Sequence, residues 1–251
     1  MMAPWLTVIT TPRRQDYLAS TIAAIDAAGG LHDWKGLKFL YVDGNSDDLL
    51  WKPSPSGWLI SSQESHGNAA NSLRVLKDAA KFKVPYVLFF EDDLKISRNA
   101  IPVMAELEVP SDCWALQFCD LRSFGDPRSD EIRIFRQSMG DDVNVECDPK
   151  KACTMWGNQA LKIPERTLKL IAESKIPDQW EAQHGPHNAD TMFSLISLEQ
   201  KEAPYLGIVA PSLVKHVGSV RSMNNEGREL DLGRSARNFP GEDFDARSLL
   251  K

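Results

Sequence analysis

Three adjacent carboxylates, Glu91, Asp92 and Asp93, follow the apolar run "VPYVLFF" at residues 84–90. Like charges this close repel one another, and removing them from water is costly unless a positive group compensates. Taken alone, such a triplet is most often the solvated start of a loop. The other interpretation is a cation site, because carboxylate oxygens suit the hard ions Mg²⁺ and Mn²⁺.

Other polar residues stand where strands are expected to end. In an open α/β sheet, ligands bind at the carboxyl ends of the strands. A helix N-terminus and a glycine also allow close backbone approach to polar or anionic ligand groups, although simple helix capping accounts for Gly67 and Asn68 as well. The residues that follow the first two expected strands or open the second expected helix are Thr10, Thr11, Arg13, Asp43, Gly67, Asn68 and Asn71.

Two titratable residues later in the chain are further candidates. Asp190 lies in the first turn of a helix expected over residues 188–199, where a carboxylate can act as a base or simply complement the helix dipole. His216 ends an expected strand just before Gly218, and a single histidine in such a place is usually structural. Neither residue alone therefore distinguishes a functional role from a structural one.

The first half of the chain alternates strands and helices. "WLTVITT" predicts a buried strand over residues 5–11, and the apolar residues after it recur at helical spacing until Gly29 and Gly30. This alternation predicts an α/β unit with a mostly parallel sheet. The other expected elements are a strand over 37–44, the short strand "WLISS", a helix over "HGNAANSLRVLKDAAKF" and the strand over 84–90.

The second half departs from this alternation. "CWALQF" is expected to form a strand, "EIRIFR" and "VNVEC" a hairpin, and "YLGIVAPSLVKHVG" a final strand pair. Helices are expected from Pro164 and over residues 188–199. From Met223 the sequence is polar and weakly periodic, which predicts a tail or flap over residues 223–251. The predicted fold class is α/β, with a mixed, mostly parallel central sheet and a small β-hairpin.

Composition limits the kinds of protein that fit. The 251 residues are 42% hydrophobic and 25% charged, which is typical of a soluble globular chain with ample core. The net charge of -6 argues against a broad basic surface, and no apolar stretch is long enough to span a bilayer. No secretory signal is apparent, so a cytoplasmic location is expected. Four cysteines without a C-x-x-C spacing are expected to be small buried residues: Cys113, Cys119, Cys147 and Cys153.

Taken in order, these pieces resemble the GT-A glycosyltransferase superfamily over about residues 5–220. "EDD" is similar to the family's D-x-D motif, "SHGNAANSLRVL" to its Gly- and Asn-containing helix start, and "CTMWGNQALKI" to the loop beside the donor sugar. The resemblance implies a single GT-A domain over residues 1–222. Residues 1–110 would form its nucleotide-sugar-binding half and residues 111–222 its acceptor and catalytic half.

The resemblance also implies roles for individual residues. Glu91, Asp93 and His216 would bind Mn²⁺ or Mg²⁺ at the donor diphosphate. Asp190 in "PHNADTMFSL" would be the catalytic base, although the family's usual Glu-Asp pair is Ala189-Asp190 here. The residues implied at the donor are Thr10, Thr11, Arg13, Asp43, Gly67, Asn68, Asn71, Asp92, Trp156 and Gly157.

These roles predict an inverting glycosyltransferase that moves a sugar from a nucleotide-sugar, expected to be UDP-linked, to an acceptor hydroxyl. One alternative is a metal-dependent nucleotidyltransferase, which normally carries a Gly-rich basic loop where "TTPRRQD" has no glycine. A second is a nucleotide-binding module without turnover. The acceptor stays open among a protein, a small molecule, a glycan and a modified DNA base, and no membrane partner is expected.

Overall fold

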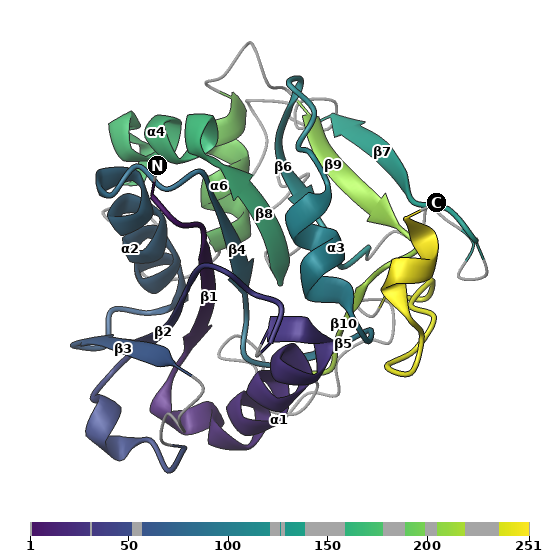
Figure 1. Ribbon diagram of the computed structural model, residues 1–251. Coiled ribbons are helices and arrows are strands. Elements are labelled where there is room, and N and C mark those ends of the chain that lie inside the picture. The colour runs from purple at the N-terminus through teal and green to yellow at the C-terminus, as the bar shows by residue number, and fades with distance from the viewer. Residues whose placement is uncertain are drawn as a thin grey trace.

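Figure 1 shows the computed structural model of the chain. Trp156, Gly157 and the expected strand "VNVEC" lie outside the part that it describes. The described residues are 2–30, 32–51, 57–120, 126, 129–138, 159–177, 189–198, 205–218 and 236–250.

An eight-stranded sheet forms the centre of the molecule (Figure 1). Its strands lie in the order β3-β2-β1-β4-β8-β6-β9-β7. Their bounds are β1 Trp5–Thr10, β2 Leu37–Asp43, β3 Trp58–Gln63, β4 Tyr86–Phe90, β6 Cys113–Gln117, β7 Arg133–Ser138, β8 Ala160–Pro164 and β9 Tyr205–Ala210.

The first four strands form a continuous parallel block, as the alternation of strands and helices predicts. β1 pairs in parallel with β2 and β4, and β2 pairs in parallel with β3. Every residue of β1 is buried, which is typical of a parallel strand covered on both faces. The carboxyl ends of these strands therefore share one edge of the sheet, where Thr10, Asp43 and Glu91 lie at or just beyond the strand ends.

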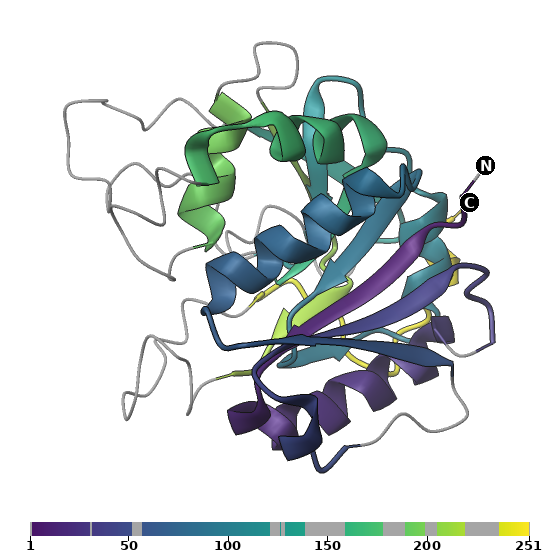
Figure 2. The ribbon, with the colours of Figure 1, turned by 90° about the vertical axis from the view of Figure 1, so that its left-hand side faces the viewer.

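Helices cover both faces of the sheet, as the side view in Figure 2 shows. α1 and α3 contribute to the core on one face, and α2, α4 and α6 contribute to the core on the other. Among the described residues, no helix combines the length and the apolar character that crossing a membrane requires. The helix bounds are α1 Gln15–Ile25, α2 Asn68–Lys81, α3 Ala100–Glu106, α4 Glu165–Glu173 and α6 Ala189–Leu198.

The second half of the sheet is mixed. β8 pairs antiparallel with both β4 and β6, whereas β6 pairs in parallel with β9. β7 closes this edge by pairing antiparallel with β9. The predicted fold class, an α/β protein with a mixed, mostly parallel sheet, is confirmed.

A second sheet, with two strands, lies beyond the end of β4. β5 (Leu94–Ile96) pairs antiparallel with β10 (Val214–His216). The sequence predicts two strands within residues 205–218, and both form, but β10 leaves the central sheet to pair with β5. β5 was not expected from the sequence, because three residues are too few to show a period of two.

Part of the tail or flap expected over residues 223–251 is described, and these residues, 236–250, pack against the segment after β5. The backbone N–H of Arg98 donates to the carbonyl of Glu242 at 2.9 Å, and the N–H of Ala246 donates to the carbonyl of Arg98 at 2.9 Å. Ala246 and Leu249 are buried against the core beside α1 and α3. These contacts hold the segment that directly follows β5.

Lys162 is a buried lysine whose charge affects stability. Its side chain is on β8, is 6% exposed and donates to the carbonyl oxygens of Ala105 and Leu107, each at 2.7 Å. These carbonyls lie at the C-terminal end of α3, where a cation is favourable. Burial nevertheless lowers the pKa of Lys162 to about 8, with Glu108 opposing the shift.

We expect the stability of the protein to rise with pH because of Lys162. Between pH 8 and the unfolded pKa of about 10.4, the unfolded chain binds more protons than the folded one, so the free energy of unfolding increases with pH. The full effect is on the order of 3 kcal/mol. Lys162→Met should remove this slope, as urea unfolding of both proteins at several pH values between 7.5 and 10.5 would show. Parallel pH profiles for the two proteins would contradict the prediction.

Candidate metal and donor site

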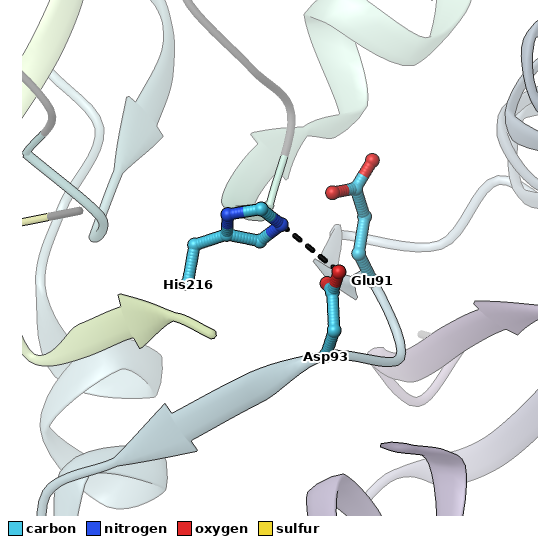
Figure 3. A group of neighbouring side chains, drawn as sticks. All are labelled: Glu91, Asp93 and His216. Carbon is cyan, nitrogen blue, oxygen red and sulfur yellow. Dashed lines mark hydrogen bonds and ion pairs between the residues drawn. The ribbon is translucent and has the colours of Figure 1, made fainter. Parts of the chain in front are cut away.

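Glu91, Asp93 and His216 come together at the carboxyl edge of the sheet (Figure 3). One potential ligand atom from each lies within 4.8 Å of the others. Glu91 and Asp93 are in the turn between β4 and β5, and His216 is the last residue of β10, paired with Leu94. The small antiparallel sheet therefore brings the histidine to the carboxylates. The sequence predicts this set of three residues as metal ligands, and the structure places them side by side.

The segment after β10 wraps tightly around Asp93. The N–H of Val217 donates to the backbone carbonyl of Asp93 at 2.9 Å, and His216 Nε2 lies 2.9 Å from Asp93 Oδ2. A Cβ atom on the buried Gly218 would overlap the Asp93 carboxylate and come within 3.0 Å of Arg14 Nη2. A glycine is needed here because the backbone approaches the carboxylate directly.

We expect Gly218→Ala to displace the Asp93 carboxylate and to weaken metal binding. The added methyl group overlaps a carboxylate that is held by Arg14 and His216, while Val217 fixes the backbone of the same residue, so the carboxylate has little room to give way. The measurement is Mn²⁺ affinity beside melting temperature. Mn²⁺ affinity equal to that of the wild type would mean that Asp93 does not bind the metal, or that its position is less constrained than these contacts indicate.

Asp92 is buried and is held by one hydrogen bond and one ion pair. Thr10 Oγ1 donates to Asp92 Oδ2 at 2.6 Å, and Arg14 Nε lies 3.1 Å from Asp92 Oδ1. Its side chain is 3% exposed. The resemblance places Asp92 and Thr10 at the donor, but these contacts make the pair an internal support for the turn that carries Glu91 and Asp93.

Arg14 is the residue of this site that the sequence analysis misses. Thr11 accepts a hydrogen bond from the N–H of Arg13 at 3.2 Å, and this contact caps a short 3-10 helix over Pro12–Arg14. Arg13, the predicted donor residue, is exposed, whereas Arg14 turns inward and forms ion pairs with Asp92 and Asp93. The sequence "PRR" contains both arginines, and only the helical turn determines which of them faces the acids.

Opposing effects set the charge state of the cluster. Burial raises the pKa of Asp92 to about 7 and the pKa of Glu91 to about 7, and the neighbouring Asp93 adds to both shifts. Burial also acts to raise the pKa of Asp93, but His216 and Arg14 outweigh it and lower that pKa. For His216, burial acts to lower the pKa, but the hydrogen bond with Asp93 and the negative charges of Asp93 and Glu91 together outweigh it, so the pKa is raised. Asp93 is therefore the carboxylate that stays ionised most readily.

The three residues fit a hard divalent cation. Asp93 Oδ1 is buried and has no hydrogen-bond partner among the described residues, although the other oxygen of the same carboxylate has two. Glu91 accepts only a long contact of 3.5 Å from Asn68, and its side chain is partly exposed. Two carboxylates and an imidazole nitrogen suit Mn²⁺ and, with fewer protein ligands, Mg²⁺.

Asp43 and Asn71, both implied at the donor by the resemblance, make hydrogen bonds within the protein. Asp43 accepts hydrogen bonds from Ser65 Oγ at 3.0 Å, the N–H of His66 at 2.7 Å and the N–H of Gly67 at 2.9 Å. The Asn71 amide donates to the carbonyl of Tyr41 at 3.1 Å and accepts from Arg74 at 3.0 Å. These contacts fix the loop before α2 and the ends of β2 and β3.

Gly67 precedes the first turn of α2 and has a φ of +90°, a conformation that favours glycine. Asn68 follows it, accepts a hydrogen bond from Ser72 at 3.1 Å and reaches toward Glu91. The N-terminus of α2 therefore lies beside the acidic cluster, as the sequence predicts for Gly67 and Asn68. Asp43 holds this loop in place through the backbone of residues 66 and 67.

Asp190 lies in the first turn of α6, as predicted. It is partly exposed, and its backbone carbonyl accepts a hydrogen bond from Ser194 at 2.9 Å. α6 packs beside α2 on the same face of the sheet. The described contacts do not join Asp190 to the acidic cluster, so its role remains a prediction, and the other predicted donor residues, Trp156 and Gly157, lie outside the described chain.

No family model and no curated protein matches this sequence. Two solved structures of the galactosyltransferase LgtC, one in complex with donor and acceptor sugar analogs and one of an active-site mutant, are similar in the arrangement of strands and helices. Each is 12% identical to this chain, and each match covers 79% of this chain. The first match covers 72% of the LgtC chain with a TM-score of 0.48, and the second covers 71% with a TM-score of 0.47. These figures describe a partial likeness in the arrangement of strands and helices and no more. The reaction of this chain must be argued from its own residues.

Proposed function

We propose that this protein is a metal-dependent glycosyltransferase that uses a nucleotide-sugar, with a UDP-linked sugar as the expected donor. The observation that carries the proposal is the cluster of Glu91, Asp93 and His216 at the carboxyl edge of the sheet, with a buried Asp93 oxygen that has no hydrogen-bond partner in the described part of the chain. A carboxylate oxygen left without a donor in a buried site is costly unless a ligand completes it. Ligands of α/β proteins also bind at this edge.

Several side chains of the site have chemical tasks in this proposal. Glu91, Asp93 and His216 would hold a divalent cation, which when bound neutralises charge on the departing diphosphate. The N-terminus of α2, which begins at Asn68, lies beside the cluster, and a helix N-terminus favours an anionic ligand. Thr10 and Arg14 hold Asp92 and thereby fix the turn that presents the ligands.

The proposed reaction is a single displacement with inversion at the anomeric carbon. Asp190 would accept the proton of the acceptor hydroxyl as that oxygen forms the new glycosidic bond. The bond from the anomeric carbon to the diphosphate oxygen breaks in the same step, and its electron pair leaves with the diphosphate. Support for this role is the partly exposed position of Asp190 in the first turn of α6, beside α2.

A panel of nucleotide-sugars with Mn²⁺, scored for slow hydrolysis of the donor, tests the proposal without knowledge of the acceptor. We expect one UDP-sugar to be hydrolysed fastest and EDTA to stop the reaction. Release of pyrophosphate from a nucleoside triphosphate and a sugar phosphate would instead favour a nucleotidyltransferase. Binding of a nucleotide-sugar without turnover toward any acceptor would favour a nucleotide-binding module.

A further inference from the structure

Arg14 is a mostly buried arginine that contacts the acidic cluster. Its side chain is 14% exposed, and its guanidinium contacts two carboxylates at once, with Nε 3.1 Å from Asp92 Oδ1 and Nη2 paired with Asp93 Oδ2. The planar guanidinium suits such a double contact, and it stays charged at all physiological pH values. The Tyr17 ring lies 5.4 Å from the guanidinium and adds a cation–π contact.

The two carboxylates that Arg14 contacts are held differently. Asp92 has both oxygens engaged within the protein, one by Thr10 and one by Arg14, so it anchors the guanidinium. Asp93 shares one oxygen, Oδ2, between Arg14 and His216. Arg14 and a cation bound by Asp93 and His216 therefore need the negative charge of the same carboxylate.

We propose that Arg14 competes with the divalent cation for Asp93, so that the free protein binds metal weakly and the anionic donor strengthens that binding. This inference rests on the metal site of the proposed function. A fixed positive charge within a few ångströms of a divalent ion opposes its binding, and it also reduces the negative charge that Asp93 offers. The anchor on Asp92 keeps Arg14 at the site when Asp93 turns to the metal.

The diphosphate of the donor resolves this competition. A guanidinium binds phosphate oxygens through the same paired geometry that it uses for carboxylates. When the donor arrives with the metal, its negative charge compensates both cations, and Arg14 no longer depends on Asp93. Metal and donor binding are therefore coupled, and by linkage each strengthens the other by the same factor.

The test is Mn²⁺ affinity of the free protein, measured by electron paramagnetic resonance of unbound Mn²⁺ without any nucleotide. We expect Arg14→Gln to bind Mn²⁺ about tenfold more tightly than the wild type, because one opposing charge is gone. Arg136→Gln is the matched control, because it removes the same charge from an arginine–aspartate pair at the outer edge of the sheet. That control should leave Mn²⁺ affinity unchanged.

The second measurement is the factor by which saturating UDP increases Mn²⁺ affinity. It should be clearly larger in the wild type than in Arg14→Gln, since only the wild type has the guanidinium to pair with the diphosphate. Equal or weaker Mn²⁺ binding by a folded Arg14→Gln protein, or an unchanged UDP factor, overturns the proposal.

Removing Arg14 leaves Asp92 as an unpaired buried acid, which is destabilising. If Arg14→Gln does not fold, the comparison is made between Arg14→Gln/Asp92→Asn and Asp92→Asn, where the same tenfold difference is expected. The results separate failure of this inference from failure of the metal site. If the wild type and the variants all fail to bind Mn²⁺, with or without UDP, both the proposed metal site and the proposed role of Arg14 are wrong. If they bind Mn²⁺ with equal affinity, only the proposed role of Arg14 is wrong.

Discussion

Asp93→Asn is expected to abolish metal-dependent donor binding while the protein stays folded. Asparagine keeps the shape of the side chain and can still accept from Arg14, but it has no negative charge to offer a divalent cation. Loss of an outer partner of a metal ligand typically costs about 10–100-fold in affinity, and loss of a ligand itself should exceed about 100-fold. Mn²⁺ titration and UDP-sugar binding, each with and without EDTA, measure the effect.

Asp33→Asn is the matched control for this substitution. Asp33 also pairs with an arginine, Arg247, at 2.8 Å, but at an exposed position. It should therefore leave Mn²⁺ affinity unchanged. Donor binding that persists in Asp93→Asn at wild-type strength, or that is insensitive to EDTA, would remove the metal from the proposed function.

The substitution Asp190→Asn is expected to lower turnover by about two to four orders of magnitude, the usual contribution of a positioned general base. Asparagine keeps the shape but cannot accept the proton of the acceptor hydroxyl at neutral pH. Donor affinity should remain near that of the wild type, because Glu91, Asp93 and His216 are unchanged. The measurements are transfer rate, UDP affinity and melting temperature of the same protein.

If Asp190 only complements the dipole of α6, the outcome is different. The loss is then a stability effect of about 0.3–1 kcal/mol, and activity per folded molecule barely changes. Glu165→Gln is a suitable control, since Glu165 is the first-turn acid of α4. Because it also pairs with Lys169 at 2.8 Å, its substitution gives an upper bound on the dipole effect. Full turnover in Asp190→Asn with intact donor binding would exclude Asp190 as the base and would leave inversion without its main support.

Long apolar runs and helix stops made the parallel half of the fold predictable. Strands such as β1 and β4 could be recognised in the sequence, because strands covered on both faces are almost continuously apolar. Gly29 and Gly30 correctly marked the end of the first helical segment. Gly29 has a φ of +100°, a conformation that favours glycine. β5 and α3 were not predicted, because each is short and α3 contains Pro102, which disguises its helical period.

The sequence indicated which residues belong to the candidate site better than it indicated which residues contact one another there. Glu91 and Asp93 were identified because they follow an apolar strand, whereas His216 was implied by the resemblance to the GT-A superfamily. Which neighbours face inward depends on single turns of the backbone, so Arg14 was missed in favour of Arg13. Asp43 is a predicted donor residue, and the sequence did not indicate that its carboxylate accepts hydrogen bonds from the loop before α2. These hydrogen-bond partners depend on tertiary packing, which the periodicity of the sequence does not reveal.

The pairing of β5 with β10 has a consequence for biosynthesis. His216 and Asp93 are 123 positions apart in the chain, so at about 5–20 residues per second the ribosome adds the histidine roughly 6 to 25 s after the acidic triplet. During that interval Arg14, already synthesised, can neutralise part of the charge of the triplet. A complete metal site exists only in chains that have been synthesised and folded beyond residue 216.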